Sequence, residues 1–416
     1  MRLPKRWNNH NWYLFLLLWG SLFSCGQPEP IYFPATEREV EVFSTELGIA
    51  YNQRSLQFFK ERCDHRRFTW RSYKGAFSGS DLDETTQHVK EGFTFLQFFM
   101  GNSYQPDFPY IYMLPIARED SNYYVFFRRN NASGGYQYVK ARIERREDGV
   151  DSRTVLTDFF TFSAGQWGSE IMYDYTSIIA VGPLEEQKFN SQLDDQVTSV
   201  AALYESGEIE AAEREMKKLP TAATHTLNFW NRRLTALLGA DSTLFEQGFQ
   251  AFREMYPENS ALLLWELHRA IYYSKFVEGL QALKQLEERI GTLDGNICYL
   301  RSNFWYALDN MYKAREWGER AVEIEPDYHA FQVDLLHVYL QFEAYEKAVN
   351  VLNKLRYLGY DFTQLELDGF PEFMASKEYL AWDLVNSDAR PKVIQETDLL
   401  DQFVDEANEL AQQALQ

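Results

Sequence analysis

The sequence predicts two unlike parts: an α+β N-terminal roll of helices followed by an antiparallel sheet, and then an all-α solenoid of helix pairs. Two observations lead to this prediction. From residue 108 apolar residues alternate with period two, which is typical of a sheet with one buried face. Beyond residue 200, small and apolar residues recur every 33 to 35 positions, which indicates stacked copies of one helical unit.

The first segment of the chain has the layout of a secretory signal. Three basic residues within the first six positions precede a short apolar core at 14–18. This core is shorter than the roughly 20 apolar residues that cross a bilayer. The segment ends in Leu-Phe-Ser-Cys at 22–25, which resembles the lipobox of bacterial lipoproteins. The resemblance implies removal of residues 1–24 and acylation of Cys25, for example with palmitate. The alternative is an ordinary signal peptide with a chance cysteine.

The next residues predict a tether and three helices. Residues 25–35 contain three prolines and are predicted to form a short, stiff tether. Thr36 and Glu39 match a capping box at the start of a helix. Apolar residues spaced three to four apart predict further helices at 56–62 and 86–100.

An antiparallel meander is predicted after these helices. A turn at 163–165 then leads to a helix near Ser169, which is expected to cap it. Over 36–180 the order of elements resembles cystatin-like or nuclear transport factor 2-like folds, and the resemblance implies no known activity. The predicted strands cover 110–116, 123–129, 136–146 and 153–162.

The second half contains an internal repeat. Equivalent positions follow one another at 33, 34, 35 and 34 residues, and the residues four and seven positions later share their helix face. Residues 305–326 resemble the second half of a tetratricopeptide (TPR) repeat. The resemblance implies a TPR solenoid of about five repeats over 190–360, with a helical cap and tail over 361–416. The equivalent positions are Ala212, Phe245, Gly279, Ala314 and Ala348.

The charge of the chain limits the classes of partner that are expected, and its cysteines predict buried thiols or a disulfide. The full chain carries a formal charge of −20, and the predicted signal segment removes three further positive charges, so nucleic acid is not expected as a partner. Residues 128–153 carry a local excess of three positive charges, expected to be a solvated strand face or a surface for acidic groups. Cys63 and Cys298 are expected to be buried thiols, with one long-range disulfide as the alternative.

The sequence lacks the usual catalytic and metal-binding motifs. No catalytic residue, metal ligand or cofactor is therefore predicted. Cys63 and His65 could pair as nucleophile and base, but sequence neighbours rarely do so. Asp158 lies in an aromatic strand, where a structural acid is favoured over an acid in a ligand pocket.

A partner-binding groove is predicted on the inner helices of the repeats. TPR proteins that bind a C-terminal carboxylate use Lys where Tyr299 stands here and Asn where Asp334 stands, so that clamp is not supported. The groove is predicted to be aromatic and polar, suited to a peptide or a protein helix. Its lining residues are predicted to be Asn296, Tyr299, Asn303, Tyr306 and His337.

Together these features predict a non-catalytic cell-envelope protein, lipid-anchored to a membrane, with the outer membrane favoured. It would bind an unidentified protein or peptide partner. The alternative is a small-ligand-binding protein or enzyme that uses a pocket near Asp158. A nutrient-capturing outer-membrane lipoprotein is a third hypothesis, disfavoured because that family places its helices first.

Overall fold

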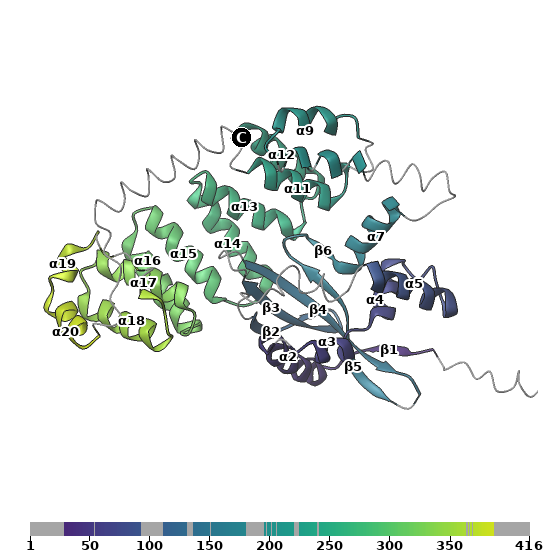
Figure 1. Cartoon of the computed structure of the whole chain (residues 1–416), viewed down its shortest axis with the longest axis horizontal. Coiled ribbons are helices and arrows are strands. Elements are labelled where there is room, and N and C mark those ends of the chain that lie inside the picture. Colours follow the sequence, from purple (N-terminus) through teal and green to yellow (C-terminus); the bar gives the residue numbers. More distant parts are fainter. Residues whose placement is uncertain are drawn as a thin grey trace, which may run out of the picture. The chain divides into compact units, whose positions relative to one another are not determined.

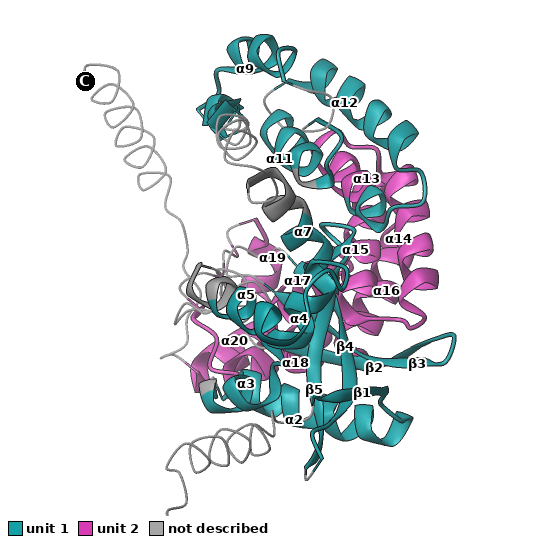
Figure 2. Ribbon diagram, turned by 90° about the vertical axis from the view of Figure 1, so that its right-hand side faces the viewer, with its two compact units in different colours: residues 1–264 teal, residues 265–416 magenta. Residues whose placement is uncertain are grey.

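The chain divides into two compact units, Met1–Leu264 and Trp265–Gln416 (Figure 2). The helices and strands of both units are labelled in Figure 1. The predicted signal segment, Cys25 and the predicted C-terminal tail beyond residue 386 lie outside the described residues. Within the described part of the chain, no helix combines the length and apolar content needed to cross a bilayer. The computed structural model describes residues 29–53, 55–92, 111–130, 136–149, 151–179, 195–196, 198–200, 202–204, 206–219, 224–238, 241–362, 365, 367 and 369–386.

The first unit opens with a short strand and four helices. The predicted capping box is confirmed, because the Thr36 hydroxyl accepts from the Glu39 amide and the Glu39 carboxylate accepts from the Thr36 amide. The predicted tether is only partly a linker, since residues 31–34 form a strand. The third predicted helix begins earlier than expected, and residues 93–100 lie outside the described part. These elements are β1 (Ile31–Pro34), α2 (Glu37–Asn52), α3 (Leu56–Arg62), α4 (His65–Ser72) and α5 (Gly79–Gly92).

The predicted antiparallel meander is confirmed. The sheet has the order β2-β3-β4-β5-β6, and β1 pairs with the end of β4. On the core side, Val139, Ala141 and Ile143 of β4 join Phe43 and Leu47 of α2 in one hydrophobic cluster. The strands are β2 (Ile111–Glu119), β3 (Asn122–Asn130), β4 (Tyr136–Glu147), β5 (Ser152–Thr161) and β6 (Gln166–Trp167).

The opposite face of β4 is less exposed to solvent than the sequence predicts. The cationic groups of Lys140 and Arg142 lie over the Trp167 ring, 5.3 and 4.2 Å from its centroid. Glu144 forms ion pairs with Arg67 and Arg71 of α4. Long side chains thus cover the sheet with their stems while their charges are paired or stacked.

Several of the positive residues over 128–153 pair with other groups of the protein. Arg128 is fully buried and donates to Asn130. Arg145 pairs with Glu39 and Glu147. The prediction of a solvated face is therefore wrong for Arg128, whereas Arg145 is partly exposed and Arg153 is exposed.

The described part of the first unit continues through further helices. Ser169 lies inside α7, so the prediction that it caps this helix is wrong; its hydroxyl donates to Asp158 instead. The Asn259 amide and the Ser260 hydroxyl donate to backbone carbonyls of the turn after β5. These helices are α7 (Gly168–Ile179), α9 (Ile209–Met216), α11 (Leu227–Leu237) and α12 (Ser242–Met255), and α13 (Ser260–Tyr272) crosses into the second unit.

The second unit is helical, and successive helices from α14 to α18 pack against one another. The repeat positions lie at these contacts: Ala314 and Ala348 are fully buried, and a Cβ added to Gly279 would lie 2.5 Å from the Phe304 ring. Small residues therefore set how closely the helices approach. The helices are α14 (Phe276–Ile290), α15 (Gly295–Ala307), α16 (Met311–Ile324), α17 (His329–Gln341), α18 (Tyr345–Tyr357), α19 (Pro371–Met374) and α20 (Lys377–Val385).

The last two helices of the described residues cover the end of this array. Phe373, Tyr379 and Trp382 join one core cluster with Leu352 and Leu355 of α18. The Trp382 indole N–H donates to the Asn353 side chain at 3.0 Å. The aromatic side chains of α19 and α20 therefore shield the apolar face of α18 from solvent.

Both described cysteines are free and buried, one in each unit. The prediction of buried thiols is therefore confirmed for Cys63 and Cys298. Burial raises the pKa of both thiols, to about 12 for Cys298. Neither sulfur is placed as a ready thiolate nucleophile.

Candidate functional site

Four polar side chains meet between α15 and α17 of the second unit. Tyr299 and Asn303 come from α15, and Asp334 and His337 come from α17. The Tyr299 hydroxyl and the Asn303 amide both hydrogen-bond the Asp334 carboxylate. We call these four residues the polar cluster.

Helical spacing brings the polar cluster together. On α15, Tyr299, Asn303 and Tyr306 are three and four residues apart and form a partly exposed stripe, while Ile297 and Phe304 are buried in the core. On α17, Asp334 and His337 are three residues apart and both remain partly exposed. The stripes of the two helices therefore meet through Asp334.

Aromatic rings flank the cluster at both ends. The Tyr299 ring stacks on Phe331 with 5.1 Å between centroids. His337 stacks on Phe370, with its centroid 6.2 Å away. Tyr306 retains 43% of its accessible surface, so a large amphipathic ring remains available beside the cluster.

The polar cluster contains one carboxylate and no Lys or Arg. Asp334 is the only acidic residue of α15 and α17, and Arg301 is the only Arg or Lys. Arg301 is paired with Glu287 at 2.6 Å and lies over the Trp317 ring. These two helices have no further Lys or Arg that could pair with Asp334.

The pKa values in the cluster follow from burial. Burial raises the pKa of Asp334, against the hydrogen bond from Asn303 and the charge of His337. Burial lowers the pKa of His337, so its neutral form is favoured at neutral pH. Burial also raises the pKa of Tyr299 to about 12, which keeps its hydroxyl proton available for donation.

Two residues differ from the predicted groove. Asn296 is only 6% exposed at the start of α15, and its side-chain nitrogen has no hydrogen-bond partner among the described atoms. It therefore contributes to the interior and not to an open surface. Asp334, which is not among the predicted lining residues, lies at the centre of the cluster. Its three-residue spacing from His337 is the sequence signal for this position.

Asp158 is a buried acid with a complete set of partners. Its carboxylate accepts from the amides of Phe159 and Ser169 at 2.9 and 3.1 Å and from the Ser169 hydroxyl at 2.6 Å. Burial raises its pKa to about 6 in spite of these bonds and of the charge of Arg71. These three donors account for its position within the protein, as expected for a structural acid.

The Cys63-Asp64-His65 sequence is also explained by structure. Asp64 caps α4 by accepting from the Arg67 amide at 2.8 Å. Cys63 precedes the cap and forms an isolated bridge to Leu156 of β5. The three residues therefore join α4 to the sheet.

The roll contains a polar cavity of about 500 Å³ that was not predicted from the sequence. It was missed because its lining comes from α2, α3, β4 and β5. Arg62 pairs with Glu46 and donates to Thr154, and Arg145 pairs with Glu39. The charged groups around the cavity therefore largely pair with one another. The lining residues are Glu39, Glu61, Arg62, Arg145, Ser152, Arg153 and Thr154.

Across the described residues, no three His, Cys, Asp or Glu side chains are grouped so that they could hold a metal ion. No model of a known protein family matches the chain, and none of the curated proteins is significantly similar to it.

Proposed function

We propose that this protein is a lipid-anchored, non-catalytic component of the cell envelope that binds a protein or peptide partner through a TPR array. The observation that carries the proposal is the polar cluster, in which two successive helix pairs present Tyr299, Asn303, Asp334 and His337 together. The anchor would be the acylated Cys25, with the outer membrane favoured.

The helix packing of the second unit supports the TPR interpretation. The small or buried repeat positions lie on α14, α16 and α18, whereas the polar cluster lies on α15 and α17. In a TPR array one helix of each pair lines the inner surface and the other fills the seam between pairs. The observed division of residues follows that pattern.

The chemistry of the cluster supports binding more than catalysis. Tyrosine rings give a large contact area at a low entropic cost and are common at the centres of protein interfaces. Asp334 and Asn303 provide hydrogen-bonding groups that fix the orientation of a bound segment. The formal charge of −20 on the full chain makes nucleic acid an unsuitable partner.

Partner capture from detergent-solubilised envelopes tests this proposal with matched tyrosine variants. Tyr299→Ala and Tyr306→Ala should each weaken capture of the proteins held by the wild type, by about 2 kcal/mol or more if the ring is an anchor. Tyr312→Ala on α16 is the control, because Tyr312 is 74% exposed but lies outside the cluster.

Two results would contradict the proposal. One is equal loss of capture in the cluster and control variants, which would place the contact elsewhere. The other is loss of function in Asp158→Asn with normal behaviour of both cluster variants. That result would favour the alternative of a ligand or substrate site in the N-terminal roll.

A further inference from the structure

The described chain enters the roll at one end of the sheet. β1 pairs with the last residues of β4, with Ile31 opposite Glu147. Glu147 is also opposite Ser152, the first residue of β5. Ile31 therefore lies at the end of the β4–β5 hairpin, and this end is where a preceding lipid anchor would join the roll.

A buried network fixes β1 to α4. The Tyr32 hydroxyl donates to Asp64 at 2.9 Å, and the same carboxylate oxygen accepts from Arg146 of β4 at 3.0 Å. The Asp64 side chain is only 1% exposed, so this oxygen is well shielded from solvent. The strand is thus tied through side chains as well as through its backbone pairing.

Arg67 of α4 strengthens the same junction. Its guanidinium lies 4.5 Å from the ring centroids of both Tyr32 and Trp70. It also donates two hydrogen bonds to Glu144, at 3.1 and 3.2 Å. A planar guanidinium held between two rings and forked onto a carboxylate has little freedom to move.

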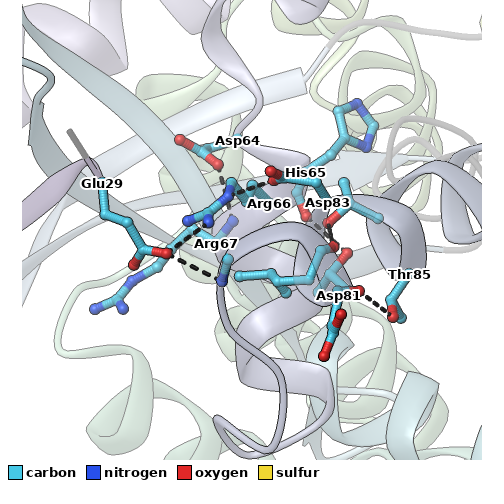
Figure 3. A network of polar contacts seen from close by, with 12 residues as sticks. Glu29, Asp64, His65, Arg66, Arg67, Asp81, Asp83 and Thr85 are labelled. Carbon is cyan, nitrogen blue, oxygen red and sulfur yellow. Dashed lines mark hydrogen bonds and ion pairs between the residues drawn. The ribbon is translucent and has the colours of Figure 1, made fainter. Parts of the chain in front are cut away.

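The contacts reach back to Glu29. Its carboxylate pairs with Arg66 at 3.2 Å and accepts from the Gly79 amide at 3.0 Å (Figure 3). Arg66 is in turn paired with Asp83 of α5 at 2.7 Å. The chain is therefore held to the roll from Glu29 onwards.

The distance to the predicted lipid is consequently short. Four residue steps separate Cys25 from Glu29, and a fully extended chain covers at most about 14 Å over that length. Ile31, six steps away, lies within about 20 Å of Cys25. Ile31 and Phe33 point to the same side of β1 and are 59% and 36% exposed, so two apolar side chains lie beside the anchor.

We propose that the roll is mounted directly on the bilayer, with β1 and the β4–β5 hairpin end facing the lipid headgroups. This orientation rests on the acylation of Cys25 in the proposed function. The partner of this surface is the bilayer interface itself, into which Ile31 is placed to insert.

Tether length, and not lipid charge, sets the orientation. Residues 145–153 contain three arginines and three acidic residues, so the hairpin end has no net formal charge. Association through this end should therefore depend little on anionic lipid or salt. The far end of β5 lies about 30 Å away along the strand, since each residue advances about 3.3 Å.

Energy transfer to labelled lipid measures the orientation. Full-length acylated protein is reconstituted in phosphatidylcholine vesicles that contain an acceptor lipid, with a donor dye at Ser152→Cys or at Ala164→Cys. Ser152 is at the hairpin end, and Ala164 follows the far end of β5. Wild-type protein is the labelling blank, because Cys63 and Cys298 are buried.

We expect several-fold stronger transfer from Ser152→Cys than from Ala164→Cys. Insertion of eight Gly/Ser residues after Gln27 should weaken the Ser152→Cys signal while the lipid is retained. Salt and anionic lipid should leave the ratio unchanged.

Equal energy transfer from the two sites in acylated protein would contradict the proposed orientation of the roll on the bilayer. It would not contradict the acylation of Cys25. The mass of the mature N-terminus separates this outcome from failure of the anchor. An unmodified Cys25 would overturn both the anchor and the orientation that depends on it.

Discussion

At the scale of single residues, Asp158 combines full burial with a complete set of donors. Burial raises its pKa from 3.8 to about 6. Between these values the unfolded chain carries a charged Asp158 while the folded protein keeps it protonated. The contribution of this group to stability is fully present below pH 4 and is lost as the pH rises through 6.

The fall in stability with rising pH gives a prediction for Asp158→Asn. The variant keeps an oxygen for the two amides and places an amide beside the Ser169 hydroxyl, but it cannot ionise. The wild type should lose about 2 kcal/mol of unfolding free energy relative to the variant between pH 4 and 7. Denaturant unfolding of both proteins at the two pH values measures the difference. A difference that does not change with pH would contradict the assigned cause.

The sequence could predict some of these residue roles but not all of them. That Tyr299, Asn303 and Tyr306 lie on one face of α15 was predictable because helical spacing fixes which residues share a face, while their binding role stays a prediction. The same spacing could not show that Asn296 is buried, since burial depends on what packs against the first turn of α15. The partners of Asp158 include Ser169, eleven residues away, and only the fold brings them together.

At the scale of elements, close helix packing depends on Gly279. A Cβ added there would lie 2.5 Å from the Phe304 ring and 2.7 Å from the Ala270 methyl carbon. Both neighbours belong to well-packed helices and cannot move freely. The lack of a side chain on α14 therefore permits contact with α13 and α15.

Gly279→Ala should consequently destabilise the protein. Alanine favours a helix by about 1 kcal/mol over glycine, but the overpacking should cost about 1–3 kcal/mol and outweigh or cancel that gain. Thermal unfolding measures the effect, with the exposed Gln281→Ala on the same helix as control. An increase in melting temperature for Gly279→Ala would show that α14 is not packed as described.

The elements missed by sequence reasoning are those stabilised by tertiary contacts. β1 has four residues and ends in proline, so its sequence resembles a linker; its pairing with β4 and the Tyr32–Asp64 bond define it. α4 contains three arginines and little apolar periodicity. Arg67 and Arg71 pair with Glu144, and Arg66 pairs with Glu29 and Asp83, which lie far away in the sequence. The meander was predictable because its alternation is local in the sequence.

At the scale of the whole molecule, the proposal assigns different tasks to the two units. The roll would hold the protein at the membrane through β1, and the helical unit would present the polar cluster to a partner. Each task depends on contacts within its own unit. Variants at the junction of β1 and variants in the cluster should therefore affect anchoring geometry and partner capture separately.

Site-specific photo-cross-linking in intact envelopes tests the central claim most directly. A photoreactive amino acid is placed at Tyr306, beside the cluster, or at the exposed Tyr312 of α16 as the matched control. The proposal predicts a discrete protein adduct from position 306 that fractionates with membranes, and no such adduct from position 312. It also predicts that Cys25→Ala removes the adduct from the membrane fraction. Equal adducts from both positions, or none from position 306, would contradict partner binding at the polar cluster.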